Sequence, residues 1–230
     1  AFNNASSGPI KKAANSYGSH VEGYNCEAGV TGDIGGGEHA EGYNTSAFGA
    51  ASHTEGLNTR TGPVGGSGAG PLDSFGAAAH AEGSGSIAEG FAAHAEGSGT
   101  QAVGNFSHAG GYGSISSGYA SFATGINTFA GGTGSTTFGR YSIATQDGQL
   151  SAGFNQLGGA TSPSQYSIYH LILDNGLIGL GTLTIDGNIV GPTSIPSIHL
   201  GASWKFQAEI VGIDTATENT TVSKIEGAII

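Results

Sequence analysis

Basic residues are scarce in this chain of 230 residues, which has 6 Lys and Arg against 17 Asp and Glu and a net charge of −11. Nucleic-acid phosphates and anionic membrane surfaces both attract basic segments, so the charge argues against either as a partner. The only cysteine is Cys26, which excludes an intrachain disulfide. No apolar run reaches the ~18 residues of a membrane-spanning helix, so membrane insertion is not expected.

Glycine, in contrast, is abundant, with 44 residues, and it is periodic. From Gly76 to Gly153 it stands at every seventh position, with Gln146 as the one interruption. A 14-residue repeat surrounds it and is clearest in the His-Ala-Glu-Gly segments that end at Gly83 and Gly97. A short fixed period of this kind predicts a solenoid, which extends and displays a surface rather than enclosing an active site.

The positions around the periodic glycines predict the shape of one coil. Two residues before each glycine the side chain is small, most often Ala, and residues two apart on a strand share a face. We therefore expect Ala and Gly together to line a narrow interior. Two residues after alternate glycines stand turn formers that tolerate positive φ: Asn25, Asn44, Asn58, Gly85, Gly99, Gly113, Asn127 and Asn155. Two strands and two corners per repeat predict a narrow parallel β-roll with two sheets.

Breaks in the period and in composition predict the domain organisation. Residues 1–15 are a lead-in, residues 16–155 the β-roll, residues 156–165 a linker and residues 166–230 a small antiparallel β domain. Gly23 and Gly42 are 19 residues apart and Gly56 and Gly83 are 27 apart, which predicts loop insertions at 30–36 and 61–74. In the C-terminal part, residues 204–210 alternate strictly between apolar and polar and predict a strand. The chain begins without Met and ends on an expected strand, so we expect a fragment of a longer protein.

A row of histidines follows the repeat, three residues before the glycine, and a row of glutamates follows two positions later. Stacked coils would align like carboxylates at about 4.8 Å, which is repulsive unless they are neutralised. Later coils place Phe122, Thr136 and Leu150 in the histidine row, so the row is not expected to face only solvent. The hypothesis is a trimer interface made by His20, His39, His53, His80, His94, His108, Glu41, Glu55, Glu82, Glu96, Phe122 and Leu150.

Two other interpretations of the histidine row stay open. The row is either a solvated polar stripe or a metal site in which imidazoles from three chains meet on an axis. If charged His–Glu pairs hold an interface, they are expected to contribute most between about pH 4 and 6.5.

Candidate receptor contacts lie in the second insertion and among the aromatic residues near corners. The insertion supplies Pro63, Pro71, Leu72 and Asp73, and the aromatic candidates are Tyr112 and Tyr119. Tyrosine rings at these corners suit stacking on sugars, and equally the covering of seams between subunits. No catalytic or cofactor-binding motif is found, so neither an enzyme activity nor a cofactor is expected.

The pattern Ser-x-Ala-x-Gly at a 14-residue spacing, as in residues 107–111 and 121–125, resembles the YadA-like head of trimeric autotransporter adhesins. The His-Ala-Glu-Gly version resembles the variant of phage tail fibres. The resemblance covers roughly residues 16–155 and implies a left-handed β-roll, a homotrimer and a role in attachment. Residues 202–208 and 224–229 are similar to a β domain of phage tail fibres. A membrane anchor and a coiled-coil stalk, both expected in a complete autotransporter, are not found here.

The resulting expectation is a homotrimeric phage or virus tail fibre that binds a host cell-surface glycan or protein. Such a chain would associate with other fibre or virion components and be located in the virion or on the extracellular surface. The alternatives are a bacterial trimeric surface adhesin and a tailspike polysaccharide depolymerase with a site between subunits.

Overall fold

The computed structural model describes residues 11–12, 18–29, 36–62, 76–156, 163–168, 204–214 and 219–229. The chain divides into two units, Ala1–Ser194 and Ile195–Ile230. The described residues are all-β, and they contain no helix that is long and apolar enough to cross a membrane.

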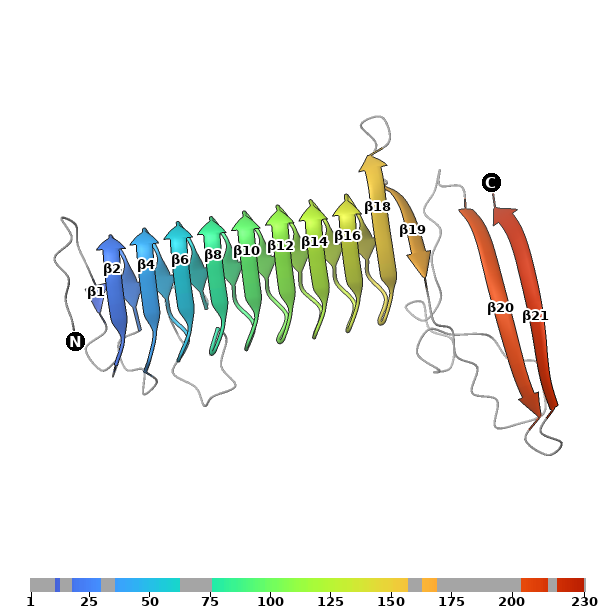
Figure 1. The fold of residues 1–230 in the computed structure, drawn as a ribbon, viewed down its shortest axis with the longest axis horizontal. Helices are drawn as coiled ribbons and strands as arrows, with labels where there is room; N and C mark the ends of the chain where they lie inside the picture. The colour runs from blue at the N-terminus through green and yellow to red at the C-terminus, as the bar shows by residue number, and fades with distance from the viewer. Residues whose placement is uncertain are drawn as a thin grey trace. The chain divides into compact units, whose positions relative to one another are not determined.

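The first unit is a parallel β-solenoid with coils of about 14 residues, as the glycine period predicts. Each full coil contributes one long strand and one short strand, and the long strands stand side by side in chain order (Figure 1). The long strands are β2 (His20–Tyr24), β4 (His39–Tyr43), β6 (His53–Leu57), β8 (His80–Ser84), β10 (His94–Ser98), β12 (His108–Tyr112), β14 (Phe122–Ile126), β16 (Thr136–Arg140) and β18 (Leu150–Gln156).

The short strands form the second sheet of the solenoid. They are β1 (Lys11–Lys12), β3 (Glu27–Ala28), β5 (Ser46–Ala47), β7 (Arg60–Thr61), β9 (Ile87–Ala88), β11 (Gln101–Ala102), β13 (Ile115–Ser116), β15 (Phe129–Ala130) and β17 (Ile143–Ala144). The predicted lead-in thus contributes β1, which pairs in parallel with β3. Two sheets built from alternate strands confirm the expected coil.

The strand register is the same on both sides of each predicted insertion. His20 pairs with His39 across the first insertion, and His53 pairs with His80 across the second. The segments 30–35 and 63–75 lie outside the described residues. Thr61, which we assigned to the second insertion, instead belongs to β7 and is fully buried. The insertion therefore begins later than predicted, because Thr61 fills the small interior position of its coil.

The interior of the solenoid consists almost entirely of small side chains, with Glu38 and Gln149 as larger buried exceptions. The row two residues before each glycine, which includes Ala40, Ala95 and Thr137, is almost completely buried, as predicted. The row two positions earlier is also buried, and it carries serines and threonines whose hydroxyls bond to one another, such as Thr100 Oγ1 to Ser86 Oγ at 3.0 Å. Backbone ladders and small polar contacts therefore stabilise the coils in place of a core of large apolar groups.

The glycines of the long strands do not line this interior, so that part of the expectation is wrong. Gly83, Gly97 and Gly111 are exposed, and their φ angles are between +95° and +104°. A Cβ on Gly97 would stand 2.2 Å from the carbonyl oxygen of Gly111 in the next coil. Glycine is needed here because neighbouring backbones approach too closely for any side chain.

Both corners of each coil use residues with positive φ. At the first corner seven of the eight predicted turn formers do so, for example Asn25 at 54° and Gly113 at 62°, and Tyr141 at 57° adopts the same conformation. The eighth, Asn155, instead lies within β18, where the chain pairs with the following strand rather than turning into another coil. The second corner lies two residues after the other glycine of the coil, and there Ala, Phe and Gly residues hold it, for example Ala92 at 49°. The sequence pattern predicted two corners per coil but did not identify the residues of this second one, because Ala and Phe are not turn formers.

The last coil of the solenoid is followed by a reversal of direction. Strand β19 (Pro163–Ile168) pairs antiparallel with β18. The segment expected as a linker, residues 156–165, therefore begins with the last residue of β18 and ends with three residues of β19. In the second unit, β20 (Trp204–Asp214) and β21 (Asn219–Ile229) form an antiparallel pair, which confirms the strand predicted over 204–210.

Candidate functional site

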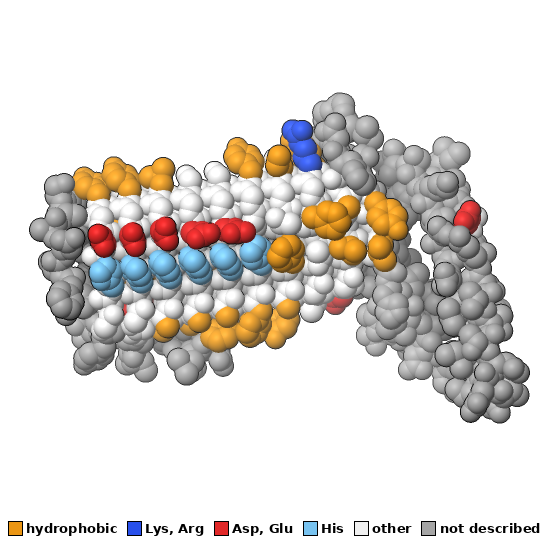
Figure 2. Space-filling model, in the orientation of Figure 1, with side chains coloured by type: hydrophobic (Ala, Val, Ile, Leu, Met, Phe, Trp, Pro, Cys, Tyr) orange, Lys and Arg blue, Asp and Glu red, His pale blue; other side chains and the backbone are white. Residues whose placement is uncertain are grey.

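One face of the long-strand sheet gathers the residues that the sequence places at the interface. We call it the His–Glu face, and Figure 2 shows its two rows side by side along the solenoid. Each His occupies the first position of its strand and each Glu the third, so parallel pairing aligns like with like in every coil. The face comprises His20, His39, His53, His80, His94, His108, Glu22, Glu41, Glu55, Glu82 and Glu96.

The six imidazoles form a continuous row in which the two end pairs, His20–His39 and His94–His108, meet edge to face. Ring centroids of successive histidines are 4.5 to 4.9 Å apart. The rings of His39, His53, His80 and His94 are nearly parallel, with interplanar angles of 1° to 4°. The stack continues onto Phe122, whose ring lies 4.7 Å from that of His108. The exchange of His for Phe in this row therefore preserves ring stacking.

Carboxylates lie along one side of the stack. The Nε2 atom of His39 is 3.5 Å from an oxygen of Glu41, and that of His80 is 3.7 Å from an oxygen of Glu82. His108 instead contacts Glu96 of the preceding coil at 3.5 Å, because its own coil has Gly110 in the glutamate row. The Nε2 atoms of His39, His53, His80 and His94 are buried and make no hydrogen bond.

Burial and repulsion between neighbouring imidazoles lower the pKa of His39, His80 and His108. Burial is the largest cause for His39, His80 and His108, followed by repulsion from adjacent imidazoles. The glutamates oppose this effect without cancelling it. At these three positions the histidines therefore lose their charge at a pH below 6.5, which was the upper limit expected for charged His–Glu pairs.

An apolar patch continues the two rows at the C-terminal end of the solenoid. Phe122 and Leu150 stand in the histidine row and Phe138 in the glutamate row, while Tyr166 and Ile168 lie on β19, paired with the last coil. Exposure of Phe122, Phe138, Tyr166 and Ile168 ranges from 40% to 62%. The predicted interface residues Phe122 and Leu150 thus belong to the same face as the histidines.

The aromatic receptor candidates do not lie together. Tyr112 ends β12, in the row of Tyr24 and Tyr43, and is 60% exposed. Tyr119 lies at the second corner, 5.4 Å from the ring of Phe106. The other candidates, Pro63, Pro71, Leu72 and Asp73, lie outside the described residues.

Sequence reasoning missed one aromatic cluster at the second corner. The ring of Phe106 contacts those of Phe91 and Tyr119 edge to face, at 5.3 and 5.4 Å. The three residues come one or two positions after Gly90, Gly104 and Gly118, which is the signal that would have identified them.

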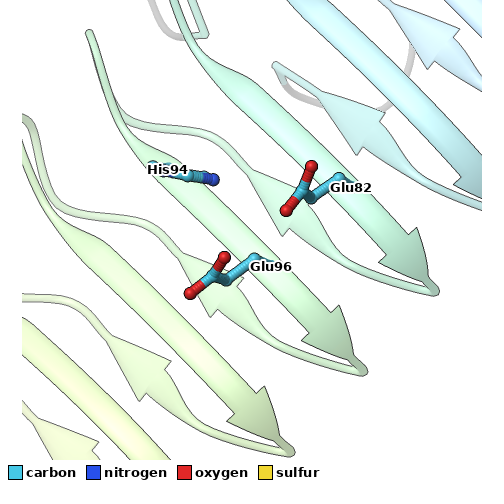
Figure 3. Close-up of side chains that lie close together, drawn as sticks. All are labelled: Glu82, His94 and Glu96. Atoms are coloured by element: carbon cyan, nitrogen blue, oxygen red, sulfur yellow. The ribbon is translucent and has the colours of Figure 1, made fainter.

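One group on the His–Glu face combines donor atoms that metal ions use. Single donor atoms of Glu82, His94 and Glu96 all lie within 4.8 Å of one another, on the neighbouring strands β8 and β10. Figure 3 shows the imidazole of His94 directed toward the two carboxylates. This group belongs to a single chain, unlike the metal site that the sequence led us to consider, in which three chains each supply an imidazole.

No protein-family model matches the chain, and no curated protein shows significant similarity to it.

Proposed function

We propose that this chain is the head of a homotrimeric attachment fibre of the phage or virus tail-fibre type, located in the virion, that binds a host cell-surface glycan or protein. The proposal is supported above all by the solenoid's combination of a very small interior with large apolar side chains on its surface. A chain that buries mainly Ala, Ser and Thr gains little hydrophobic stabilisation from its own core. Association with further copies would cover the apolar surface that one chain leaves exposed.

The apolar patch is the part of the surface that best suits contact between copies. Its aromatic and aliphatic side chains are contiguous across β14, β16, β18 and β19. They also continue the half-buried histidine row, so one copy would cover both features together. The proposed handedness of the coil and the trimeric state come from the likeness to YadA-like heads.

Oligomeric state is the first test of the proposal. Sedimentation equilibrium should give about three times the chain mass of 22.6 kDa. Phe122→Glu places a charge in the patch and should shift the protein toward monomer, whereas Phe122→Leu keeps an apolar side chain and should leave the trimer intact. A wild-type protein that sediments as a monomer at all concentrations would contradict the proposal.

Attachment is tested on cells. Fluorescently labelled protein should bind saturably to cells of a susceptible host and not to derivatives that lack their surface polysaccharide or receptor protein. Incubation with isolated surface polysaccharide should release no new reducing ends. Absence of binding to a panel of hosts would contradict the attachment role, and release of reducing ends would identify a depolymerase instead.

A further inference from the structure

The His–Glu face contains an unbalanced row of negative charge. Parallel pairing aligns Glu55, Glu82 and Glu96 directly on successive strands, and like charges in directly paired positions destabilise a sheet. The imidazole Nε2 atoms of His80 and His108 lie 3.7 Å from Glu82 and 3.5 Å from Glu96, respectively. A cation bound along this row would remove the repulsion.

Glu82, His94 and Glu96 form the part of the His–Glu face that best matches a metal site. Among the residues that the structure describes, this is the one group in which three potential ligand atoms lie mutually within 4.8 Å. The Nε2 atom of His94 is buried and has no hydrogen-bond partner, so its lone pair is available for coordination. In Figure 3 that ring points between the carboxylates of the two glutamates.

The register places carboxylates from two strands beside His94. The ring of His94 is held between those of His80 and His108, each 4.9 Å away, which restricts its orientation. Glu96 comes from the same strand as His94 and Glu82 from the preceding one. One coil further on the glutamate is replaced by Gly110, so His108 has a single carboxylate neighbour.

We propose that Glu82, His94 and Glu96 bind one divalent transition-metal ion per chain, with Zn²⁺ as the best match. One imidazole nitrogen and two carboxylate oxygens are ordinary zinc ligands, at about 2.0–2.2 Å from the metal. The donor atoms lie within 4.8 Å of one another, so the two glutamate side chains would have to rotate toward the metal to reach these distances. Water completes the coordination sphere. The hard cations Ca²⁺ and Mg²⁺ prefer all-oxygen sites and should bind more weakly.

Calorimetric titration of untagged full-length protein with ZnCl₂ at neutral pH tests the site. We expect saturable binding of about one Zn²⁺ per chain and an increase in thermal midpoint on Zn²⁺ addition. His94→Phe should weaken binding by about a hundredfold, while the ring stack is preserved because Phe122 already occupies the same row. Glu82→Gln and Glu96→Gln should each weaken binding at least about tenfold.

A matched control variant and a competing cation distinguish a specific metal site from a general attraction of cations to the acidic surface. Glu27→Gln removes one negative charge from the opposite sheet and should leave Zn²⁺ affinity within about twofold. The proposal is overturned if His94→Phe binds Zn²⁺ as tightly as the wild type, or if Ca²⁺ competes on equal terms. It is also overturned if the two glutamine variants, which retain side-chain shape, bind normally. All ligands come from one chain, so these outcomes do not depend on the proposed attachment role.

Discussion

Replacement of Gly97 by alanine tests whether glycine is required for close approach between coils. Gly97 has φ of +104°, and an added Cβ would stand 2.2 Å from the carbonyl oxygen and 3.0 Å from the carbonyl carbon of Gly111. An ordinary contact needs 3.4 Å or more, so the two coils would have to separate locally by about 1 Å. The neighbouring interstrand hydrogen bonds would lengthen with them.

The expected cost follows from two contributions. A non-glycine residue at this φ is strained by about 1–3 kcal/mol. Weakening of two or three hydrogen bonds adds about 2–3 kcal/mol, and the lower entropy of the unfolded alanine chain returns about 0.5–1 kcal/mol. We therefore expect Gly97→Ala to reduce the free energy of unfolding by about 4 kcal/mol. Because solenoid stability depends on neighbouring coils, unfolding should also become less cooperative.

Gly99, two residues further on, provides the matched control. Its φ is +65°, and an added Cβ would meet nothing within 4 Å. Gly99→Ala should cost about 1 kcal/mol or less, and Gly99→Asn still less, because Asn58 and Asn127 adopt the same conformation in other coils. Urea unfolding followed by far-UV circular dichroism measures all three variants. Equal destabilisation by Gly97→Ala and Gly99→Ala would refute the close-approach argument.

Three further predictions concern the interior, the histidine stack and an ion pair. Ala95→Leu should destabilise the protein by about 3 kcal/mol in urea unfolding, because the interior at Ala95 is completely buried and admits only small side chains. His39 has a lowered pKa, so its contribution to stability is complete above the unfolded value of 6.5 and is lost as pH falls through the folded pKa. Thermal midpoints from about pH 7.5 to about 5.5 should therefore fall less steeply in His39→Phe than in the wild type. Arg60 and Glu89, 2.6 Å apart and mostly buried, should show a coupling energy of about 1 kcal/mol in a double-mutant cycle.

Each of these predictions has its own control. Ala95→Ser should cost under about 1 kcal/mol, since Ser151 occupies the same interior row, and a similar loss from Ser and Leu would contradict a size limit. The rings of His20 and His53 and the carboxylates of Glu22 and Glu41 also act on His39, and an unchanged pH profile in His39→Phe would contradict the prediction for His39. A coupling energy near zero would show that the ion pair contributes nothing net.

Much of the architecture could be predicted because it repeats. A 14-residue period can keep its register only if successive coils stack, so the pairing of His53 with His80 across a long insertion followed from counting residues. The buried row that contains Ala95 followed from the alternation of faces along a strand. The residues of the second corner did not follow, because Ala92 and Phe106 adopt positive φ under the constraint of the stacked coils rather than from their own preference.

The candidate site, like the fold, could be predicted from the sequence only in part. The order of His and Glu along the chain determined by itself that both residue types form straight rows on one face. Parallel pairing in a constant register aligns equivalent positions of successive coils, so a residue type that recurs at one position forms a row. Only the tertiary structure decided how those rows interact: the burial and imidazole repulsion that lower the pKa of His39, the burial of the His94 nitrogen and the approach of Glu82 to Glu96. The role of glycine was decided there as well, because the distance between backbones of adjacent coils depends on their packing and not on the spacing of residues along the chain.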